Sequence, residues 1–366
     1  MSKSVHQVIV ESDFLQSYNF LKGPIRSISY GDGHINDTYR LIDGRGSDYI
    51  LQRINTTVFK DPQKLMQNIL KVTAFIKSKG SQSLSVHVTQ QGLPYYCDSN
   101  GDYWRLYTFV HGMSPTHLCG ASLLKVAGKG FGAFLVQLAD FPIDSLHETI
   151  PGFHNTPMRM EQLKRAYKED RVKRANIVAK EYAFALQFER EVYTIEAALE
   201  KGDLPKRVTH NDTKVNNVLI NSKTNTAICV LDLDTLMPGS ALYDYGDGIR
   251  SSVTLTTEDE PNLDKVQLSI ERFEAFTSGY LEGARDVLTP LEIQLLPMSA
   301  ILMTLECGMR FLADYLEGDV YFKTHTEDHN LRRARTQFKL VEEMTFNYER
   351  LQEIVAKYTM KKEKRI

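Results

Sequence analysis

The chain has 366 residues, of which 42% are hydrophobic and 25% charged, ordinary values for a globular protein large enough for two lobes or domains. Its net charge of −2 excludes a general attraction to nucleic acid or anionic membranes, and no run approaches the ~18 apolar residues of a membrane span. Four dispersed cysteines without a C-x-x-C pair indicate reduced thiols, and the N-terminus lacks an apolar signal core. We therefore expect a cytoplasmic protein with neither nucleic acid nor membrane as a partner.

The first part of the chain predicts short strands around a glycine-containing turn. Residues 25–41 contain two strand-like runs, and residues 49–55 form a third by β-branched content and length. In the turn, Gly31 and Gly33 fit the first two positions of G-x-G-x-x-G, and Asn36 stands at the third. Glycine lets the backbone approach phosphate oxygens, and Asn is the next best residue at positive φ. A plain hairpin turn is the alternative, but a polar hairpin far downstream favours a nucleotide-phosphate loop.

A nucleotide-binding lobe of this kind carries a cation on its third strand. Arg53 is the best candidate, with Gln52 on the opposite face, and a surface arginine is the equal alternative. The next helix, predicted from residue 62 to 79, should carry a glutamate to pair with that cation, but it has no acidic residue beyond Lys64. Asn68 or Gln67 must therefore substitute, or the strand cation is held in another way.

A further strand ends just before a glycine and suits a hinge between two lobes. In the run from residue 103 to 110, the backbone N–H and C=O groups of Phe109 and Val110 could contact the edge of an adenine. We therefore expect a nucleotide-binding lobe at residues 1–111 and a catalytic, acceptor-binding lobe at residues 112–366.

The second lobe is predicted to be mostly helical. Apolar residues recur at three- and four-residue spacings from Ala121, and residues 156–198 carry two charged helices. Three more helices are predicted at residues 264–282, 289–318 and 328–358. Together the patterns predict an α+β fold, with an N-terminal antiparallel β lobe containing one helix and a mostly α-helical C-terminal lobe.

Residues 208–234 are predicted to form a strand, a polar loop, a strand, a turn and a strand. His210, Asp212 and Asn217 keep the H-x-D-x-x-x-x-N spacing of a kinase catalytic loop, and Asp232 lies on the return strand. A carboxylate facing the acceptor hydroxyl can orient it and accept its proton, which suits Asp212. The amide oxygen of Asn217 and the carboxylate of Asp232 are hard ligands suited to Mg²⁺, and the hairpin would bring them together.

The neighbours of these residues allow two interpretations each. His210 is expected to hydrogen-bond the loop rather than act as the base. Lys214 either meets the γ-phosphate or is solvated, and Asp234 is either a second metal contact or an acceptor that fixes the loop. A polar surface loop would contain some of these residues by chance, but the full pattern in this strand context predicts phosphoryl transfer that uses ATP and Mg²⁺.

The sequence resembles the aminoglycoside phosphotransferase and choline kinase superfamily, small-molecule kinases with a protein-kinase-like fold. Asn211 stands where protein kinases have an arginine, and the Asp-Phe-Gly and Ala-Pro-Glu motifs are absent. Within the superfamily the match is closer to the N-acetylhexosamine 1-kinases. The similarity runs from about residue 30 to about residue 341, and its motifs lie at residues 30–36, 49–52, 209–214, 232–239 and 306–319.

This resemblance implies a bilobal fold and phosphorylation of the anomeric hydroxyl of N-acetylglucosamine or N-acetylgalactosamine by ATP with Mg²⁺. It also implies that His34 faces sugar hydroxyls and that Arg310 and Tyr321 complete the acceptor pocket beside Asp212. The family likewise lacks an obvious Lys–Glu pair. From the residues alone, Arg310 either contacts a ligand or is satisfied by Glu306 one turn earlier, because an unpaired guanidinium in an apolar helix would be costly.

Two other functions are the alternatives. A kinase of another small alcohol, such as an aminoglycoside, choline or homoserine, would need an acidic pocket for a cationic acceptor, and His34 and Arg310 argue against that. A nucleotide-binding pseudokinase would account for the missing helix glutamate. Degenerate kinases usually lose one of the catalytic or metal-binding residues, however, and Asp212, Asn217 and Asp232 are all present.

Overall fold

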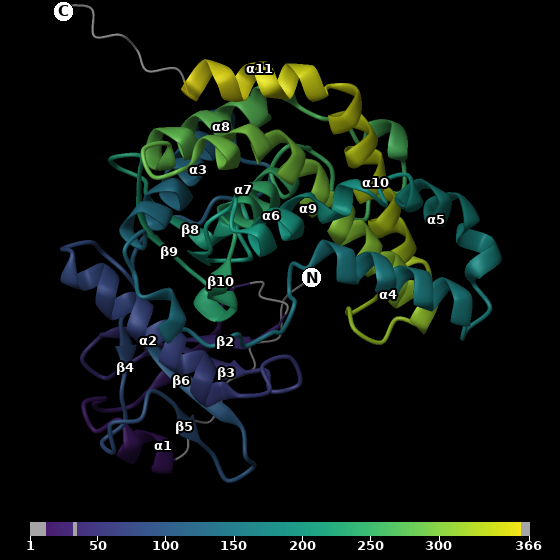
Figure 1. Cartoon of the computed structure of the whole chain (residues 1–366). Coiled ribbons are helices and arrows are strands. Elements are labelled where there is room, and N and C mark those ends of the chain that lie inside the picture. The colour runs from purple at the N-terminus through teal and green to yellow at the C-terminus, as the bar shows by residue number, and fades with distance from the viewer. Residues whose placement is uncertain (1–11, 32–34, 360–366) are drawn as a thin grey trace, which may run out of the picture. The chain divides into compact units, whose positions relative to one another are not determined.

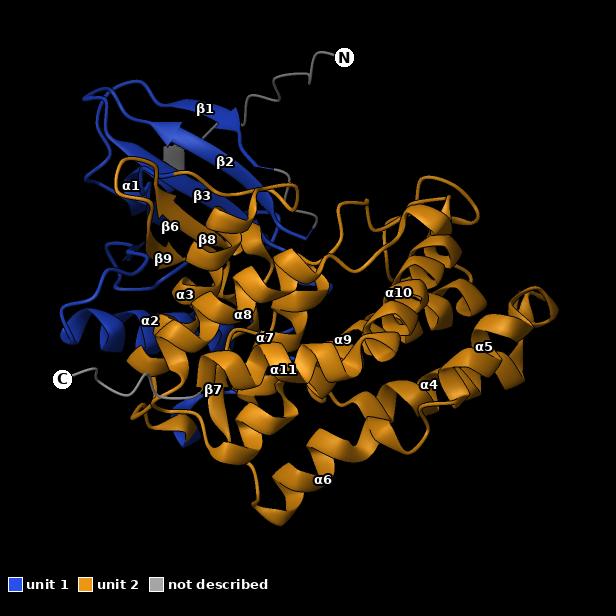
Figure 2. Cartoon of the chain, turned by 90° about the horizontal axis from the view of Figure 1, so that it is seen from above, with its two compact units in different colours: residues 1–112, 144–150 blue, residues 113–143, 151–366 orange. Residues whose placement is uncertain are grey.

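The computed structural model describes residues 12–31 and 35–359 of the chain (Figure 1). Gly33 and His34, which the sequence assigned to phosphate and acceptor contacts, lie outside the described residues. The chain divides into two compact units, one of residues 1–112 with 144–150 and one of residues 113–143 with 151–366 (Figure 2). Unit 1 contains an antiparallel sheet and unit 2 is mainly helical, so the predicted α+β fold class is confirmed.

The sheet of unit 1 has the order β1-β2-β3-β6-β4, with β5 also paired to β6, and its pairs are antiparallel. Its strands are β1 Arg26–Ser29, β2 Asp37–Ile42, β3 Asp48–Ile54, β4 Val86–His87, β5 Tyr96–Cys97 and β6 Tyr103–Thr108. Side chains alternate between its faces. On one face Leu41, Leu51 and Leu106 form a core cluster with Phe14 of α1 (Ser12–Ser17) and with Tyr18, which follows this helix.

The helix α2 (Pro62–Ser78) belongs to unit 1 and begins where the sequence predicted. Asp61 caps it by accepting the N–H of Lys64 at 3.0 Å, and proline occupies the first turn, where its missing N–H costs nothing. Asn68 donates from Nδ2 to the carbonyl of His147 at 2.8 Å and accepts the His147 N–H at 2.9 Å. These two bonds tie residues 144–150 to α2. They do not join Asn68 to the strand cation, the partner that a kinase glutamate would have in this helix.

Unit 2 contains nine α-helices within the described residues. They are α3 Ala121–Gln137, α4 Thr156–Glu169, α5 Ala179–Leu186, α6 Thr194–Lys201, α7 Ala241–Arg250, α8 Ile270–Ala284, α9 Pro290–Glu317, α10 His329–Phe346 and α11 Tyr348–Thr359.

Two predicted helical regions of unit 2 are divided differently from the expectation. Residues 156–198 hold α4, α5 and the start of α6 rather than two helices, because α4 ends at Asp170, whose φ is 40°. The last predicted helix is two helices that meet at Asn347. The Asn347 side chain donates to the carbonyl of Glu343 at 2.8 Å, the kind of local bond by which asparagine competes with a continuing helix.

The central helix of unit 2 is α9, which packs against α4, α7 and α10. It is long and apolar enough to cross a membrane, contrary to the expectation that no run approaches that length, but 78% of its apolar 18-residue window is buried in the protein. Helix α7 approaches α9 closely only because residue 246 is glycine. A Cβ on Gly246 would lie 2.5 Å from the carbonyl oxygen of Ser299. This close packing brings the polar residues of α7 beneath the loop described next.

Candidate active site

Two small antiparallel pairs in unit 2 form the frame of the site (Figure 1). β7 (Arg207–Thr209) pairs with β10 (Met237–Gly239), and β8 (Val218–Asn221) pairs with β9 (Thr226–Val230). Beyond the β8–β9 pair, the N–H of Leu231 donates to the carbonyl of Asn217 at 2.7 Å. Asn217 and Asp232, far apart in the chain, therefore lie at the same end of this hairpin.

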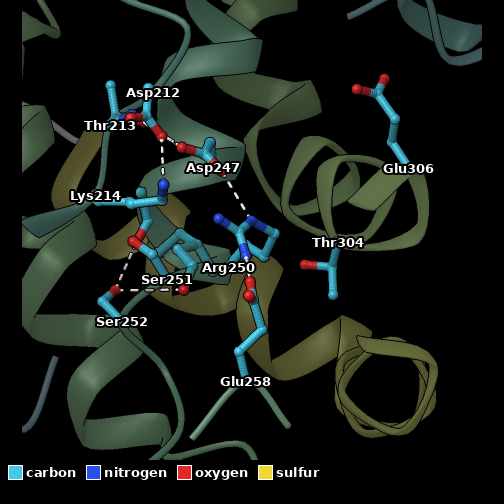
Figure 3. Close-up of polar contacts among 12 residues, drawn as sticks. Asp212, Thr213, Lys214, Asp247, Arg250, Ser251, Ser252, Glu258, Thr304 and Glu306 are labelled. Carbon is cyan, nitrogen blue, oxygen red and sulfur yellow. Dashed lines mark hydrogen bonds and ion pairs between the residues drawn. The ribbon is translucent and has the colours of Figure 1, made fainter. Parts of the chain in front are cut away.

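The carboxylate of Asp212 lies between an ammonium and an amide. Nζ of Lys214 is 3.0 Å from its Oδ1, as Figure 3 shows. Nδ2 of Asn217 is 3.3 Å from its Oδ2. The same Nδ2 donates to the main-chain carbonyl of Asp212 at 2.8 Å. The negative charge of Asp212 raises the pKa of Lys214, so this lysine is cationic at neutral pH. Because the Asp212 side chain keeps 28% of its surface exposed, an added hydroxyl can reach it.

His210 bonds the loop from both ring nitrogens. Its Nε2 is 2.7 Å from the carbonyl of Leu231, and its Nδ1 accepts the N–H of Asp212 at 3.2 Å. This pattern assigns a neutral imidazole protonated at Nε2, with no free nitrogen to take a substrate proton. The ring therefore connects the backbone of Asp212 to the strand end that carries Asp232.

Two aspartates of α7 hold the same loop from below. Asp244 accepts the backbone N–H groups of His210 and Asn211 at 2.9 and 2.7 Å, and Asp247 accepts that of Thr213 at 2.8 Å. The other oxygen of Asp247 accepts Nε of Arg250 at 2.8 Å, as Figure 3 shows. Burial opposes the ionisation of Asp247, but Arg250 and Lys214 outweigh it and hold its pKa below the ordinary value.

These aspartates were not recognised as functional from the sequence, although the stretch around them was noticed as polar and glycine-rich. Their stretch is a helix whose ten residues are all buried. A buried carboxylate that accepts two or three backbone N–H bonds has little freedom. The loop that carries Asp212 is therefore fixed by groups more than 30 residues away in the chain.

A second buried network lies behind the loop. His154 is 2.8 Å from Glu306 through Nδ1 and 3.0 Å from the carbonyl of Asn211 through Nε2, while Thr156 donates to the other oxygen of Glu306 at 2.8 Å. His154 and Glu306 are both buried. No sequence pattern pointed to His154, and Glu306 was considered only as a partner of Arg310.

Arg310 lies one turn beyond Glu306 in α9 and is placed against aromatic rings. Its guanidinium carbon is 5.2 Å from the ring centre of Phe153, 5.6 Å from that of Phe322 and 6.0 Å from that of Tyr321. Within residues 12–31 and 35–359 it makes no ion pair and no hydrogen bond. The oxygens of Glu306 are used by His154 and Thr156 instead, which argues against the interpretation that Glu306 satisfies Arg310.

The aromatic segment over Arg310 is held by Asp314, one further turn along α9. This carboxylate accepts the backbone N–H groups of Val320, Tyr321 and Phe322 at 3.0, 2.8 and 3.0 Å. It also accepts Nδ2 of Asn330 at 2.8 Å. Tyr321 itself is exposed. The structure thus brings Arg310 and Tyr321 together, while their role in an acceptor pocket, which the resemblance implies, stays a prediction.

The donor set at the hairpin suits a hard divalent cation. Because Nδ2 of Asn217 is committed to Asp212, its Oδ1 is the atom left to coordinate a metal. Asp232 has a left-handed backbone with φ 53°, and Asp234 is buried in the turn that follows. Among the described residues no three His, Cys, Asp or Glu side chains converge on one point. One amide oxygen with one or two carboxylates is a donor set that fits an ion such as Mg²⁺, which usually completes its shell with phosphate and water.

Two of the predicted phosphate-loop residues are described in unit 1. Gly31 has φ 78°, a conformation that other residues rarely adopt, and a Cβ there would meet nothing within 4 Å. Oδ1 of Asn36 accepts the N–H of Asn55 at 3.0 Å, and Nδ2 of Asn55 donates to the carbonyl of Ile35. Asn36 thereby ties the end of the loop to the end of β3.

The predicted strand cation Arg53 is directed at two carboxylates. It donates from Nε to Asp37 at 3.0 Å, opposite it on β2, and from Nη1 to Asp102 at 3.0 Å. Its neighbour Gln52 accepts Nε and Nη2 of Arg105 at 3.0 and 2.8 Å on the other face of the sheet. These contacts favour the surface-arginine alternative for Arg53.

Arg105 is the cation that the sequence did not single out. Only 1% of its surface is exposed, and its Nη1 lies 3.9 Å from the sulfur of Met66 on α2. On the α2 side of the sheet, the guanidinium of Arg105 on β6 thus pairs with the amide of Gln52 on β3. A kinase would have a strand cation paired with a helix glutamate here.

The hinge candidates follow β6. The N–H of Phe109 continues the sheet by donating to the carbonyl of Asp48 at 3.1 Å, and its ring packs beneath Arg40 at 4.6 Å. Val110 makes no main-chain hydrogen bond within the described residues. The contact of the Phe109 and Val110 backbones with an adenine stays a prediction.

Residues 28–277 match the model of the phosphotransferase enzyme family, and this stretch is more than half of the chain. The chain belongs to this phosphotransferase family. The matched stretch includes the hairpin with Asp212, Asn217 and Asp232.

Solved structures of similar fold agree with this assignment. The phosphotransferase superposes on an amicoumacin kinase in complex with AMP-PNP, Ca²⁺ and its antibiotic with a TM-score of 0.57 and 13% identity, over 87% of this chain and 88% of that chain. It superposes on choline kinase from Cryptosporidium parvum with a TM-score of 0.57 and 15% identity, over 92% of each chain. It superposes on a spectinomycin phosphotransferase in complex with ADP and spectinomycin with a TM-score of 0.56 and 16% identity, over 97% of this chain and 98% of that chain. At these identities the similarity establishes the fold, and the expected kinase-like architecture is confirmed.

The family match ends before α9 begins. Arg310, Asp314 and Tyr321 of the phosphotransferase thus lie outside the matched stretch. The identity of the acceptor is accordingly a property that family membership leaves open.

Proposed function

We propose that this phosphotransferase transfers the γ-phosphoryl group of ATP to the anomeric hydroxyl of an N-acetylhexosamine, giving the sugar 1-phosphate. N-acetylglucosamine and N-acetylgalactosamine are the acceptors. The proposal combines three supports: the catalytic hairpin, the chemistry around Arg310, and the resemblance of the sequence motifs to the N-acetylhexosamine 1-kinases. The observation that carries the choice of acceptor is the position of Arg310.

The residues of the hairpin have distinct roles in this proposal. Asp212 orients the anomeric hydroxyl and accepts its proton late in the transfer, and Lys214 leaves Asp212 to neutralise charge on the transferred group. Asn217 and Asp232 hold Mg²⁺, with Asp234 as a further contact or as an acceptor within the turn. The bound ion would neutralise charge on the phosphate oxygens.

Arg310 favours a neutral acceptor rich in hydroxyl and carbonyl oxygens. Its guanidinium offers five N–H donors, lies against three rings and has no carboxylate partner in the described chain. Arg159 adds a second guanidinium nearby, since it donates to the carbonyl of Phe153 at 2.8 Å while Arg310 lies over the ring of that residue. Two guanidinium groups around one aromatic side chain suit oxygen acceptors and repel an ammonium group.

The alternatives are weaker for stated reasons. Choline, ethanolamine and aminoglycosides are cationic acceptors, and Arg159 and Arg310 oppose them. A pseudokinase is opposed by the intact hairpin, in which Lys214 and Asn217 hold the Asp212 carboxylate.

Nucleotide binding is assigned to residues 1–111 and acceptor binding and catalysis to residues 112–366, in a cytoplasmic enzyme. In the first region, Gly31 and Asn36 belong to the phosphate loop together with Gly33. The backbone of Val110, beside Phe109, contacts the adenine. Arg53 can bind a nucleotide phosphate only if its ion pairs with Asp37 and Asp102 break.

The variant Arg53→Ala tests this last assignment. Because the guanidinium is already paired with Asp37 and Asp102, the KM for ATP should change less than about twofold and stability by about 0–1 kcal/mol, as for exposed ion pairs. Steady-state kinetics and thermal unfolding measure the two quantities. A KM for ATP raised tenfold at unchanged stability would instead assign Arg53 to the nucleotide. Arg105→Met is the matched comparison, and we expect it to lower the melting temperature because it leaves Gln52 without its donor.

Phosphorus NMR of reaction mixtures tests the function itself. The full chain is incubated with ATP, Mg²⁺ and one acceptor from a panel of N-acetylglucosamine, N-acetylgalactosamine, glucose, galactose and choline. We expect a sugar 1-phosphate signal with one or both N-acetylhexosamines, weaker signals with glucose and galactose, and none with choline. Formation of phosphocholine, or no sugar 1-phosphate from either N-acetylhexosamine, would refute the proposal. Asp212→Asn is the control for contaminating kinases.

A further inference from the structure

His154 is a buried histidine of unit 2 that has no part in the chemistry proposed above. It precedes α4, and its two ring nitrogens face two different elements. Nδ1 lies 2.8 Å from a carboxylate oxygen of Glu306 on α9, and Nε2 lies 3.0 Å from the main-chain carbonyl of Asn211. The residues it joins are 152 and 57 positions away in the chain.

These contacts indicate a doubly protonated ring. A carbonyl oxygen can only accept, so Nε2 must carry a proton, and a carboxylate oxygen at Nδ1 favours a second one. Burial opposes a charged His154, but Glu306 outweighs it and raises the pKa of the ring. Burial also opposes ionised Glu306, but His154, Arg310 and Arg159 outweigh it and hold the pKa of Glu306 below its ordinary value. The pair is therefore imidazolium and carboxylate.

The other charged groups around the pair act in the same direction. Asp247 and Asp244 face His154 from α7, and Glu196 faces it from α6. The ring of Tyr243 lies 5.4 Å away and donates its hydroxyl to Glu196. These carboxylates favour the imidazolium, and the guanidinium groups of Arg159 and Arg310 favour the ionised form of Glu306.

The atom that His154 holds belongs to the peptide group between Asn211 and Asp212. The carbonyl of this group accepts from His154, and its N–H donates to Nδ1 of His210 at 3.2 Å. Asn211 has φ 63°, a left-handed conformation that costs free energy in any residue with a side chain. The peptide that follows this residue is bonded at both ends, by His154 at its carbonyl and by His210 at its N–H, and these two bonds fix its orientation beside Asp212.

We propose that His154 is a positioning residue, which as an imidazolium paired with Glu306 holds the Asn211–Asp212 peptide in the orientation required for phosphoryl transfer. The inference rests on the proposed role of Asp212 as the base but on no particular acceptor. Loss of either ring proton places a lone pair against the Glu306 carboxylate or against the Asn211 carbonyl. Deprotonation of His154 therefore either breaks its bond to the peptide or leaves the ring that makes this bond without its ion pair to Glu306.

The sign of the pH dependence follows from the raised pKa. A histidine whose pKa is raised by folding contributes its stabilisation fully below its ordinary pKa of about 6.5, and loses it as the pH rises through the raised value. Positioning of Asp212 should therefore be complete at neutral pH and fail on the alkaline side.

The test compares wild type with Glu306→Gln. We expect kcat of the wild type to fall in the alkaline range by about 10²-fold, the scale of a small misplacement of a catalytic group. In Glu306→Gln this fall should move to lower pH by at least about one unit, because the neighbouring charge is lost. The KM for ATP should change less than about twofold. Activity is followed as ADP release, with whichever acceptor of the panel is turned over.

Two further variants and one spectrum make the outcome decisive. Thr156→Val removes the other hydrogen bond to Glu306 and should leave the alkaline fall at the wild-type pH. His154→Gln removes the titrating group, so the fall should disappear, which keeps the test open if Glu306→Gln does not fold. Nitrogen-15 NMR of labelled histidines, with His154→Gln for assignment, should show both nitrogens of His154 protonated at pH 7.

A neutral His154 at pH 7 in wild type, or an alkaline fall at the same pH in wild type and Glu306→Gln, would overturn the inference. The NMR measurement needs no acceptor. A failure of the sugar proposal is thus distinguishable from a failure of this one.

Discussion

Asp212→Asn should lower kcat by about 10²–10⁴-fold, the range that a positioned general base contributes. The amide keeps the shape of the side chain but cannot accept the proton of the acceptor hydroxyl. The backbone contacts of residue 212 with His210 and Asn217 do not involve the carboxylate, so the loop should keep its conformation. Nucleotide affinity should therefore change less than about twofold.

Steady-state kinetics and a nucleotide-binding titration measure the two quantities on the same preparation. Asp286→Asn is a matched control. It removes the same charge from a side chain that is 87% exposed and that has no proposed catalytic role. If Asp212→Asn retained near wild-type turnover, Asp212 could not be the base. If it lost nucleotide affinity as strongly as turnover, its role would be in binding.

Asp232→Ala should lower kcat/KM by about 10³-fold, because a bound metal ion contributes several kcal/mol and each 1.36 kcal/mol is tenfold in rate. The Mg²⁺ concentration for half-maximal activity should rise at the same time. Asn217 alone cannot compensate, because its amide nitrogen is committed to Asp212 and its oxygen carries no charge.

Activity measured over a range of Mg²⁺ concentrations tests this second expectation, and an unchanged dependence would remove Asp232 from the metal site. Asp234→Asn, assayed in the same series, separates the two interpretations of that residue. A shifted Mg²⁺ dependence would make Asp234 a second metal contact. A lower melting temperature with unchanged Mg²⁺ dependence would make it an acceptor that holds the turn.

The contrast between Asp212 and Arg53 shows how far sequence reasoning extends at this site. Asp212 was found because its partners His210 and Asn217 are within five residues of it, so the spacing alone carries the pattern. The environment of Arg53 depends on strand register instead. Pairing of β2 with β3 places Asp37 opposite Arg53, and the chain beyond β5 adds Asp102. A single strand read by itself contains neither partner.

The helices show the same division. Periodic apolar residues located α3, because amphipathic spacing is a local property. The helices predicted at 62–79 and 289–318 agree closely with α2 and α9, whereas α8 begins at Ile270, six residues later than predicted. The sequence of α7 indicates only a polar, glycine-rich stretch. Gly246 permits the close approach of α9 and Gly248 that of Phe276 on α8, while the aspartates bond the loop that carries Asp212. Residues whose partners lie in other elements give no local signal.

The sequence by itself determined the fold class, the order of the strands and helices along most of the chain, and the loop proposed to transfer phosphate. These properties follow from periodicity and short spacing, which any segment carries in itself. Only the tertiary structure decided what holds that loop: Asp244 and Asp247 from α7, and the ion pair of His154 with Glu306. It also decided that Arg310 faces aromatic rings rather than Glu306, because hydrogen bonds from His154 and Thr156 occupy both Glu306 oxygens. Such contacts join groups up to 152 residues apart, and chain folding alone brings them within bonding distance.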